Sequence, residues 1–188
     1  MAASDNAPAR EQDPATSIPV ARLNHAVLYV RDASAAAEFY HRVFGFEVVE
    51  SAFGGRAVFM RAAGGSNHHD LGLFSVGPDA PRPPRGSVGL YHLAWEVDTL
   101  AELSRLADRL AGAGALVGAS DHGTTKALYA HDPDGIEFEV SWLVPAELID
   151  DATLAARKQI GPLDLYREIA RYGAETRGGV GISVPAGP

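Results

Sequence analysis

The same succession of elements occurs twice in this chain of 188 residues, so the two halves are expected to fold alike. In each half a strand and a helix are followed by three strands, an order written βαβββ. The halves occupy residues 21–77 and 88–144, and a linker rich in Pro and Gly, GPDAPRPPRGS, separates them. Aligning the starting strands LNHAVLYV and GLYHLAWEV places His25 on His92, 67 residues later.

Alternating apolar residues and capping residues predict where the elements lie. Strands are expected over 23–30, 46–51, 56–62 and 69–76 in the first half, and over 89–97, 115–120, 125–131 and 135–142 in the second. A helix follows Asp32 up to Gly45, and a second follows the capping box of Thr99 and Glu102 up to about Leu110. We therefore expect an α+β fold in which paired βαβββ modules form an open, partly closed barrel around a metal site, with the helices outside.

The composition excludes several classes of protein. A content of 46% hydrophobic and 21% charged residues is typical of a globular protein, and no apolar run is long enough to span a bilayer. The net charge of -8 argues against a nucleic-acid partner, which would require clustered Lys and Arg. Because there is no cysteine, any chemistry depends on His, carboxylates, Tyr and Lys.

The two ends of the chain differ from the repeat between them. Residues 1–20 lack a basic start and an apolar block, so we expect a disordered N-terminal tail on a cytoplasmic protein without a membrane partner. Residues 21–144 form the domain, and residues 145–188 are expected to form a C-terminal helical tail. Leu165, Ile169 and Tyr172 lie on one face of its second helix. This tail either packs onto its own domain or caps a neighbouring subunit or the mouth of the cleft.

Strand periodicity and the internal repeat together indicate three candidate metal ligands. His92 lies on the less bulky face of its strand, and Glu139 alternates with apolar residues, so both are expected to face the cleft. The repeat places His25 beside them. Two histidines and one carboxylate on separate strands form the facial triad that suits non-haem iron(II). The position equivalent to Glu139 in the first half is Gly72, which leaves coordination sites free for a substrate and dioxygen.

Further polar and aromatic residues lie near these positions. Asn67, His68 and His69 open the fourth strand, where a solvated loop tip is the alternative interpretation. His122 and Tyr129 flank the seventh strand, and a tyrosine there is commonly a core residue with its hydroxyl at the rim. These residues are expected to surround the three candidate ligands.

The chain from Leu23 to Trp142 resembles the vicinal-oxygen-chelate superfamily, and more narrowly the small single-domain type I extradiol dioxygenases. The motif that carries the resemblance consists of His122, Leu128, Tyr129, Asp132, Pro133, Gly135 and Glu139. NHHDLGLF resembles the strand with the acid-base histidine of that family, and NHAVLYV resembles its first-ligand strand. Ser120 departs from the pattern, which prefers Gly, Asn, Thr or a β-branched apolar residue at that position.

The resemblance implies a function in the degradation of aromatic compounds. It implies an extradiol dioxygenase that cleaves a catechol such as 2,3-dihydroxybiphenyl with dioxygen, using Fe(II), or Mn(II) as the alternative metal. The metal ligands would be His25, His92 and Glu139. His69 would be the acid-base residue, and His122 and Tyr129 would donate hydrogen bonds to the substrate oxygens. We expect a homo-oligomer.

Two other functions remain open on the same scaffold. A glyoxalase-like isomerase or an antibiotic-inactivating thiol transferase would use the metal as a Lewis acid without redox chemistry. Gly72 disfavours the isomerases, which need four ligands, but not the thiol transferases, which also use three. A metal-free drug-binding protein would have no use for the combination of His25, His92 and Glu139.

Overall fold

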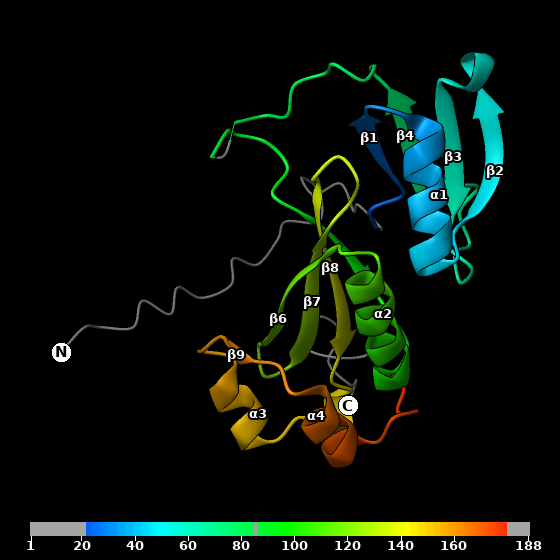
Figure 1. Ribbon diagram of the computed structural model, residues 1–188. Coiled ribbons are helices and arrows are strands. Elements are labelled where there is room, and N and C mark those ends of the chain that lie inside the picture. Colours follow the sequence, from blue (N-terminus) through cyan, green and yellow to red (C-terminus); the bar gives the residue numbers. More distant parts are fainter. Residues whose placement is uncertain (1–21, 85, 180–188) are drawn as a thin grey trace, which may run out of the picture.

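A computed structural model describes residues 22–84 and 86–179, so the expected disordered tail 1–20 lies outside the described residues. The first half forms a four-stranded sheet in the order β1-β4-β3-β2. Its elements are β1 (Ala26–Val30), α1 (Ala33–Phe44), β2 (Glu47–Ala52), the 3-10 helix η1 (Phe53–Gly55), β3 (Ala57–Arg61) and β4 (Leu71–Ser75). Figure 1 shows α1 packed against one face of this sheet.

The second half repeats this arrangement and adds a strand. Its elements are β5 (Leu93–Glu96), α2 (Leu100–Gly112), β6 (Leu116–Asp121), β7 (Thr125–His131) and β8 (Glu137–Leu143). The sheet order is β5-β8-β7-β6-β9, in which β9 (Gly161–Pro162) comes from the C-terminal segment. The extra strand is absent from the sequence-based expectation, because a two-residue strand has no detectable periodicity.

The register of the strands confirms the internal repeat. β1 and β4 are parallel with Val27 opposite Gly72, and β5 and β8 are parallel with Ala94 opposite Glu139. The second pair lies 67 residues after the first, as the alignment of the two starting strands requires. The expected α+β fold with paired βαβββ modules is therefore correct, and the modules form two separate sheets rather than a closed barrel.

The helices begin and end at the capping residues that the sequence predicts. The Asp32 side chain accepts hydrogen bonds from the backbone N–H groups of Ser34 and Ala35, and Gly45 ends α1 with φ 76°. The buried residues of α2 are all leucines, spaced three or four apart: Leu100, Leu103, Leu106 and Leu110. This apolar stripe holds α2 on its sheet and leaves the opposite face of the sheet uncovered by its own helix.

The Asp132–Gly135 turn fastens the two modules to each other. Asp134 accepts hydrogen bonds from the backbone and the side chain of Arg31, at 3.0 and 2.9 Å. The Tyr40 hydroxyl of α1 donates to Asp132 at 3.4 Å, and burial raises the pKa of both groups. In the sequence this segment has the form of an ordinary tight turn, so its role between the modules is visible only in three dimensions.

The C-terminal segment packs onto the second module of its own chain. It contains the 3-10 helix η2 (Ala146–Leu148), α3 (Asp151–Ala156), β9 and α4 (Leu165–Tyr172). Leu165, Ile169 and Tyr172 all contact the apolar core. Figure 1 shows α3 and α4 together at one end of the five-stranded sheet. Among the helices of residues 22–84 and 86–179, none has the length and apolar character needed to cross a membrane.

The Thr99 capping box gives a testable contribution to stability. Thr99 Oγ1 accepts from the Glu102 backbone N–H, and the Glu102 side chain accepts from the Thr99 backbone N–H. Thr99→Ala should lower the free energy of unfolding by about 1 kcal/mol, measured by urea denaturation. Ser104→Ala inside the same helix should leave stability equal or slightly higher, because alanine is the best helix former. Equal losses in both variants would contradict the capping role.

Candidate metal centre

The pair formed by His92 and Glu139 lies on one face of the second sheet. His92 directly precedes β5, and Glu139 lies on the neighbouring strand β8. Their side chains approach to 3.4 Å between Nε2 and Oε2. Nδ1 of His92 is buried, has no hydrogen-bond partner and lies 3.8 Å from Oε1 of Glu137. Nε2, the ring nitrogen beside Glu139, is therefore the atom of His92 that could bind a cation together with that carboxylate, while Glu137 lies near the other ring nitrogen.

Tyr129 of β7 and His122 of the turn between β6 and β7 extend this polar face. Tyr129 is directly opposite Glu139 in the antiparallel pair of β7 and β8. Its hydroxyl lies 3.1 Å from Nε2 of His122, which is also 2.8 Å from Oγ of Ser120. Burial, together with the charge of Glu139, raises the pKa of Tyr129 and so favours its protonated hydroxyl, which can donate a hydrogen bond.

His25 and His69 lie together at the first sheet. His25 directly precedes β1, and its ring centroid is 4.6 Å from that of His69. Nδ1 of His25 donates to Oδ1 of Asn24 at 2.7 Å, because that amide oxygen can only accept. This bond leaves the lone pair on Nε2 of His25 free for a ligand.

The surroundings of His69 favour its neutral form. Phe59 packs against it with ring centroids 5.0 Å apart, and Nδ1 of His68 is 3.1 Å from Nδ1 of His69. Burial and then the neighbouring His25 and His68 lower the pKa of His69. This lowered pKa favours the neutral imidazole, which can accept a proton.

The two groups of candidate ligands belong to different sheets and do not converge within one chain. In the described ranges 22–84 and 86–179, no group of three or more His, Asp or Glu side chains is arranged to hold a metal ion. A pocket of about 620 Å³ lies between the start of β1 and β5, and its lining includes His25 and Ala94 but neither His92 nor Glu139. The structure therefore brings His92 to Glu139 and His25 to His69, and leaves the two pairs apart.

Two residues of the site were not identified from the sequence. Glu137 contacts His92 on one side and His131 on the other, where Oε2 lies 3.6 Å from Nε2. The available signal was its position two residues before Glu139, which puts both carboxylates on the same face of β8. Ser120 contacts His122, so the residue that departs from the family motif is a hydrogen-bond partner of a motif residue.

A family model and one curated relative match the repeat region. The model described as the Glyoxalase/Bleomycin resistance protein/Dioxygenase superfamily matches residues 22–140. Catechol-2,3-dioxygenase of Bacillus subtilis (strain 168) is 33% identical over 119 residues, which are 63% of this chain. The match spans only 40% of the length of that relative.

Solved structures share the fold. A lactoylglutathione lyase from Agrobacterium tumefaciens is 26% identical with a TM-score of 0.50, and the match covers 66% of this chain and 95% of the other. A glyoxylase/bleomycin resistance protein/dioxygenase domain from Frankia sp. EAN1pec is 22% identical with a TM-score of 0.55, covering 65% and 92%. Since the family model covers more than half of the chain, this protein belongs to the Glyoxalase/Bleomycin resistance protein/Dioxygenase superfamily.

Proposed function

We propose that this protein is a non-haem iron(II) extradiol dioxygenase that cleaves a catechol such as 2,3-dihydroxybiphenyl. The observation that carries the proposal is the continuous polar face of β8 and β7, where Glu139 lies beside His92 and opposite Tyr129, and Tyr129 contacts His122. The similarity to a catechol-2,3-dioxygenase over 119 residues supports the same substrate class. Mn(II) is the alternative metal.

The donor atoms fit a divalent transition metal. Two imidazoles and one carboxylate are the ligands that non-haem iron(II) uses when it keeps coordination sites open. Nε2 of His92 lies 3.4 Å from the Glu139 carboxylate, its buried Nδ1 has no hydrogen-bond partner, and the Asn24 hydrogen bond leaves Nε2 of His25 free. Gly72 lies at the position equivalent to Glu139 and has no side chain that could act as a fourth ligand. Iron(II) held by His25, His92 and Glu139 would supply the redox chemistry that uses dioxygen to cleave the ring bond beside the diol.

The protein side chains would orient the substrate and move its protons. The Tyr129 hydroxyl would donate to a catechol oxygen and stabilise its negative charge. His122 would fix the orientation of that hydroxyl. A neutral His69 would accept a proton at its free ring nitrogen and return it when the ring opens. The exposed Val27 and Tyr29 of β1 would contact an aryl or alkyl substituent of the catechol.

The complete triad would form between two copies of the chain. Within one chain, aromatic contacts hold the two sheets in position relative to each other. The ring centroids of Phe44 and Phe138 are 5.4 Å apart, and those of Phe46 and Trp95 are 5.2 Å apart. Bringing His25 to His92 and Glu139 within one chain would require the two sheets to move toward each other, which would break this packing. A second copy avoids that loss, and exposed apolar residues on β1, including Tyr29 at 76% exposure, are typical of a surface that another protein covers.

The reaction itself provides the test. The protein loaded anaerobically with iron(II) and given 2,3-dihydroxybiphenyl should consume an equimolar amount of dioxygen and form a yellow product cleaved beside the diol. Oxygen uptake and visible absorbance measure both. Unsubstituted catechol should react more slowly, because it lacks a group to contact Val27 and Tyr29.

The non-redox alternative predicts a different outcome of the activity assays. The similarity to a lactoylglutathione lyase and to a fosfomycin resistance protein solved with Mn(II) indicates that this fold also occurs in such proteins. If no catechol gives oxygen uptake while a thiol adduct or a hemithioacetal is converted, the proposed dioxygenase activity is wrong. Fold similarity alone does not decide between these chemistries.

A further inference from the structure

The turn that carries His122 is held by a carboxylate on the residue before it. Oδ1 of Asp121 accepts from the backbone N–H of Gly123 at 2.8 Å. The same oxygen accepts from Nζ of Lys126 at 2.6 Å. These two bonds join residues before and after His122 in the chain, so they constrain the backbone that carries its ring.

A buried ion pair connects this carboxylate to the C-terminal segment. Lys126 is only 1% exposed, and its Nζ lies 2.9 Å from Oε2 of Glu168 on α4, which is also 1% exposed. That oxygen makes no hydrogen bond, so the contact is ionic. A buried ammonium group is strongly unfavourable unless carboxylates compensate its charge, and here Asp121 and Glu168 do so from opposite sides.

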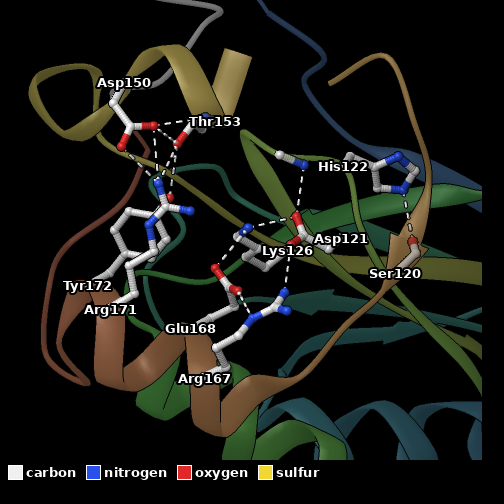
Figure 2. Close-up of polar contacts among 11 residues, drawn as sticks. Ser120, Asp121, His122, Lys126, Asp150, Thr153, Arg167, Glu168, Arg171 and Tyr172 are labelled. Carbon is white, nitrogen blue, oxygen red and sulfur yellow. Dashed lines mark hydrogen bonds and ion pairs between the residues drawn. The ribbon is translucent and has the colours of Figure 1, made fainter. Parts of the chain in front are cut away.

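Arg167 completes the cluster, as Figure 2 shows. Its Nε donates to Oε1 of Glu168 at 3.0 Å, and Nη2 lies 3.6 Å from Oδ2 of Asp121. The cluster therefore contains two cations and two carboxylates and is neutral overall. One half belongs to the β6–β7 hairpin and the other half to α4, so the charges match only when α4 is docked.

Two backbone contacts from the same segment reach the same turn. β9 pairs with the end of β6, with Gly161 opposite Asp121. Gly123 has φ +75°, and a Cβ there would lie 2.5 Å from the Thr153 carbonyl oxygen and 2.7 Å from the Arg157 nitrogen. The end of α3 thus packs directly on the turn and leaves room only for glycine.

We propose that residues 145–179 hold the Asp121–Gly123 turn in place and thereby aim His122 at Tyr129, with Lys126 and Glu168 as positioning residues. The assignment rests on the proposed function for the role of His122 in turnover. The convergence of α3, β9 and α4 on one turn carries the inference. The rest of the hairpin, 7 residues of β7 paired with β8, needs no such support.

Glu168→Gln tests the tether by removing a charge while keeping the shape of the side chain. In the full-length, metal-loaded protein, kcat should fall roughly tenfold with KM for the catechol unchanged, as for loss of a residue that supports a functional group. Amide hydrogen exchange at Gly123 should become at least about tenfold faster, while amides of β7 and β8 stay protected. Glu175→Gln, an exposed carboxylate of the same segment, is the matched control and should change neither quantity.

A double-mutant cycle separates positioning from general stability. If Glu168 acts through His122, then Glu168→Gln combined with His122→Ala should be no slower than His122→Ala alone. The pair Lys126→Met with Glu168→Leu replaces the ions by apolar groups of similar size and should still fold. This double variant should also speed amide exchange at Gly123, as Glu168→Gln does, because Asp121 loses its buried cation.

The outcomes distinguish this inference from the proposed function. Faster exchange at Gly123 in both variants supports the tether even if no catechol is cleaved, because exchange needs no substrate. Unchanged exchange and unchanged kcat in both variants overturn it, even where His122→Ala is inactive. Losses of kcat that add fully in the cycle also overturn it, since the cluster would then act on stability alone.

Discussion

Glu139→Ala should abolish metal loading while leaving the fold intact. The purified wild-type protein, prepared anaerobically, should carry about one iron or manganese per chain, as expected for a three-ligand site of this kind. Glu139 lies 3.4 Å from His92, so removing its carboxylate removes the charged ligand of the pair. Elemental analysis measures the loss, and circular dichroism checks the fold. His25→Ala and His92→Ala should have the same effect.

Two further carboxylate variants are the controls for the loss of metal in Glu139→Ala. Glu47→Ala removes an exposed carboxylate from β2 and should keep full metal content. Glu137→Ala should keep the site but weaken metal affinity about tenfold or more, because Glu137 contacts His92 without being a proposed ligand. Metal content that survives all three ligand substitutions would show that the triad is wrong.

Mixing two inactive variants tests where the triad forms. If His25 of one copy faces His92 and Glu139 of another, a mixed dimer of His25→Ala and Glu139→Ala subunits contains one intact site. Refolding the two together should restore about a quarter of the wild-type metal content, given random pairing in a twofold dimer. No recovery would indicate a site formed within one chain, because both subunits would then be defective.

His69→Ala should lower turnover roughly a hundredfold or more and leave metal content and catechol binding unchanged. The lost group is the proposed acid-base residue, and positioned groups of this kind contribute about that factor. His69 contacts the ring of His25 without taking the place of a ligand, so the effect should be in kcat. Steady-state kinetics and substrate titration under anaerobic conditions measure the two parts separately.

His68→Ala is the matched control for this change. It removes the neighbouring imidazole and should alter kcat only a few-fold. Because His68 contributes to the lowered pKa of His69, its removal should raise that pKa, and the acid limb of the kcat profile should move to higher pH. Normal turnover of His69→Ala would return His69 to the interpretation as a solvated loop residue.

Much of the fold was predictable because its determinants are local. Strand alternation, the Asp32 cap, the Thr99 capping box and the left-handed Gly45 each depend on residues within a few positions of one another. The repeat gave the equivalence of positions 67 residues apart, and the structure then showed equivalent pairings, with Val27 opposite Gly72 as Ala94 is opposite Glu139. The boundaries were less accurate, and both His25 and His92 precede their strands by one residue.

The sequence by itself determined the two modules and which residues share a strand face, and the tertiary structure decided which of those faces meet. The contact of Tyr40 with Asp132, the ion pair of Lys126 with Glu168 and the separation of His25 from His92 all depend on packing between distant segments. No local pattern encodes such packing, because its free energy depends on shape and charge complementarity that arises only when the segments have folded. For the same reason Lys126 reads in the sequence as an ordinary strand residue, while in the folded protein it is the buried cation beneath the His122 turn.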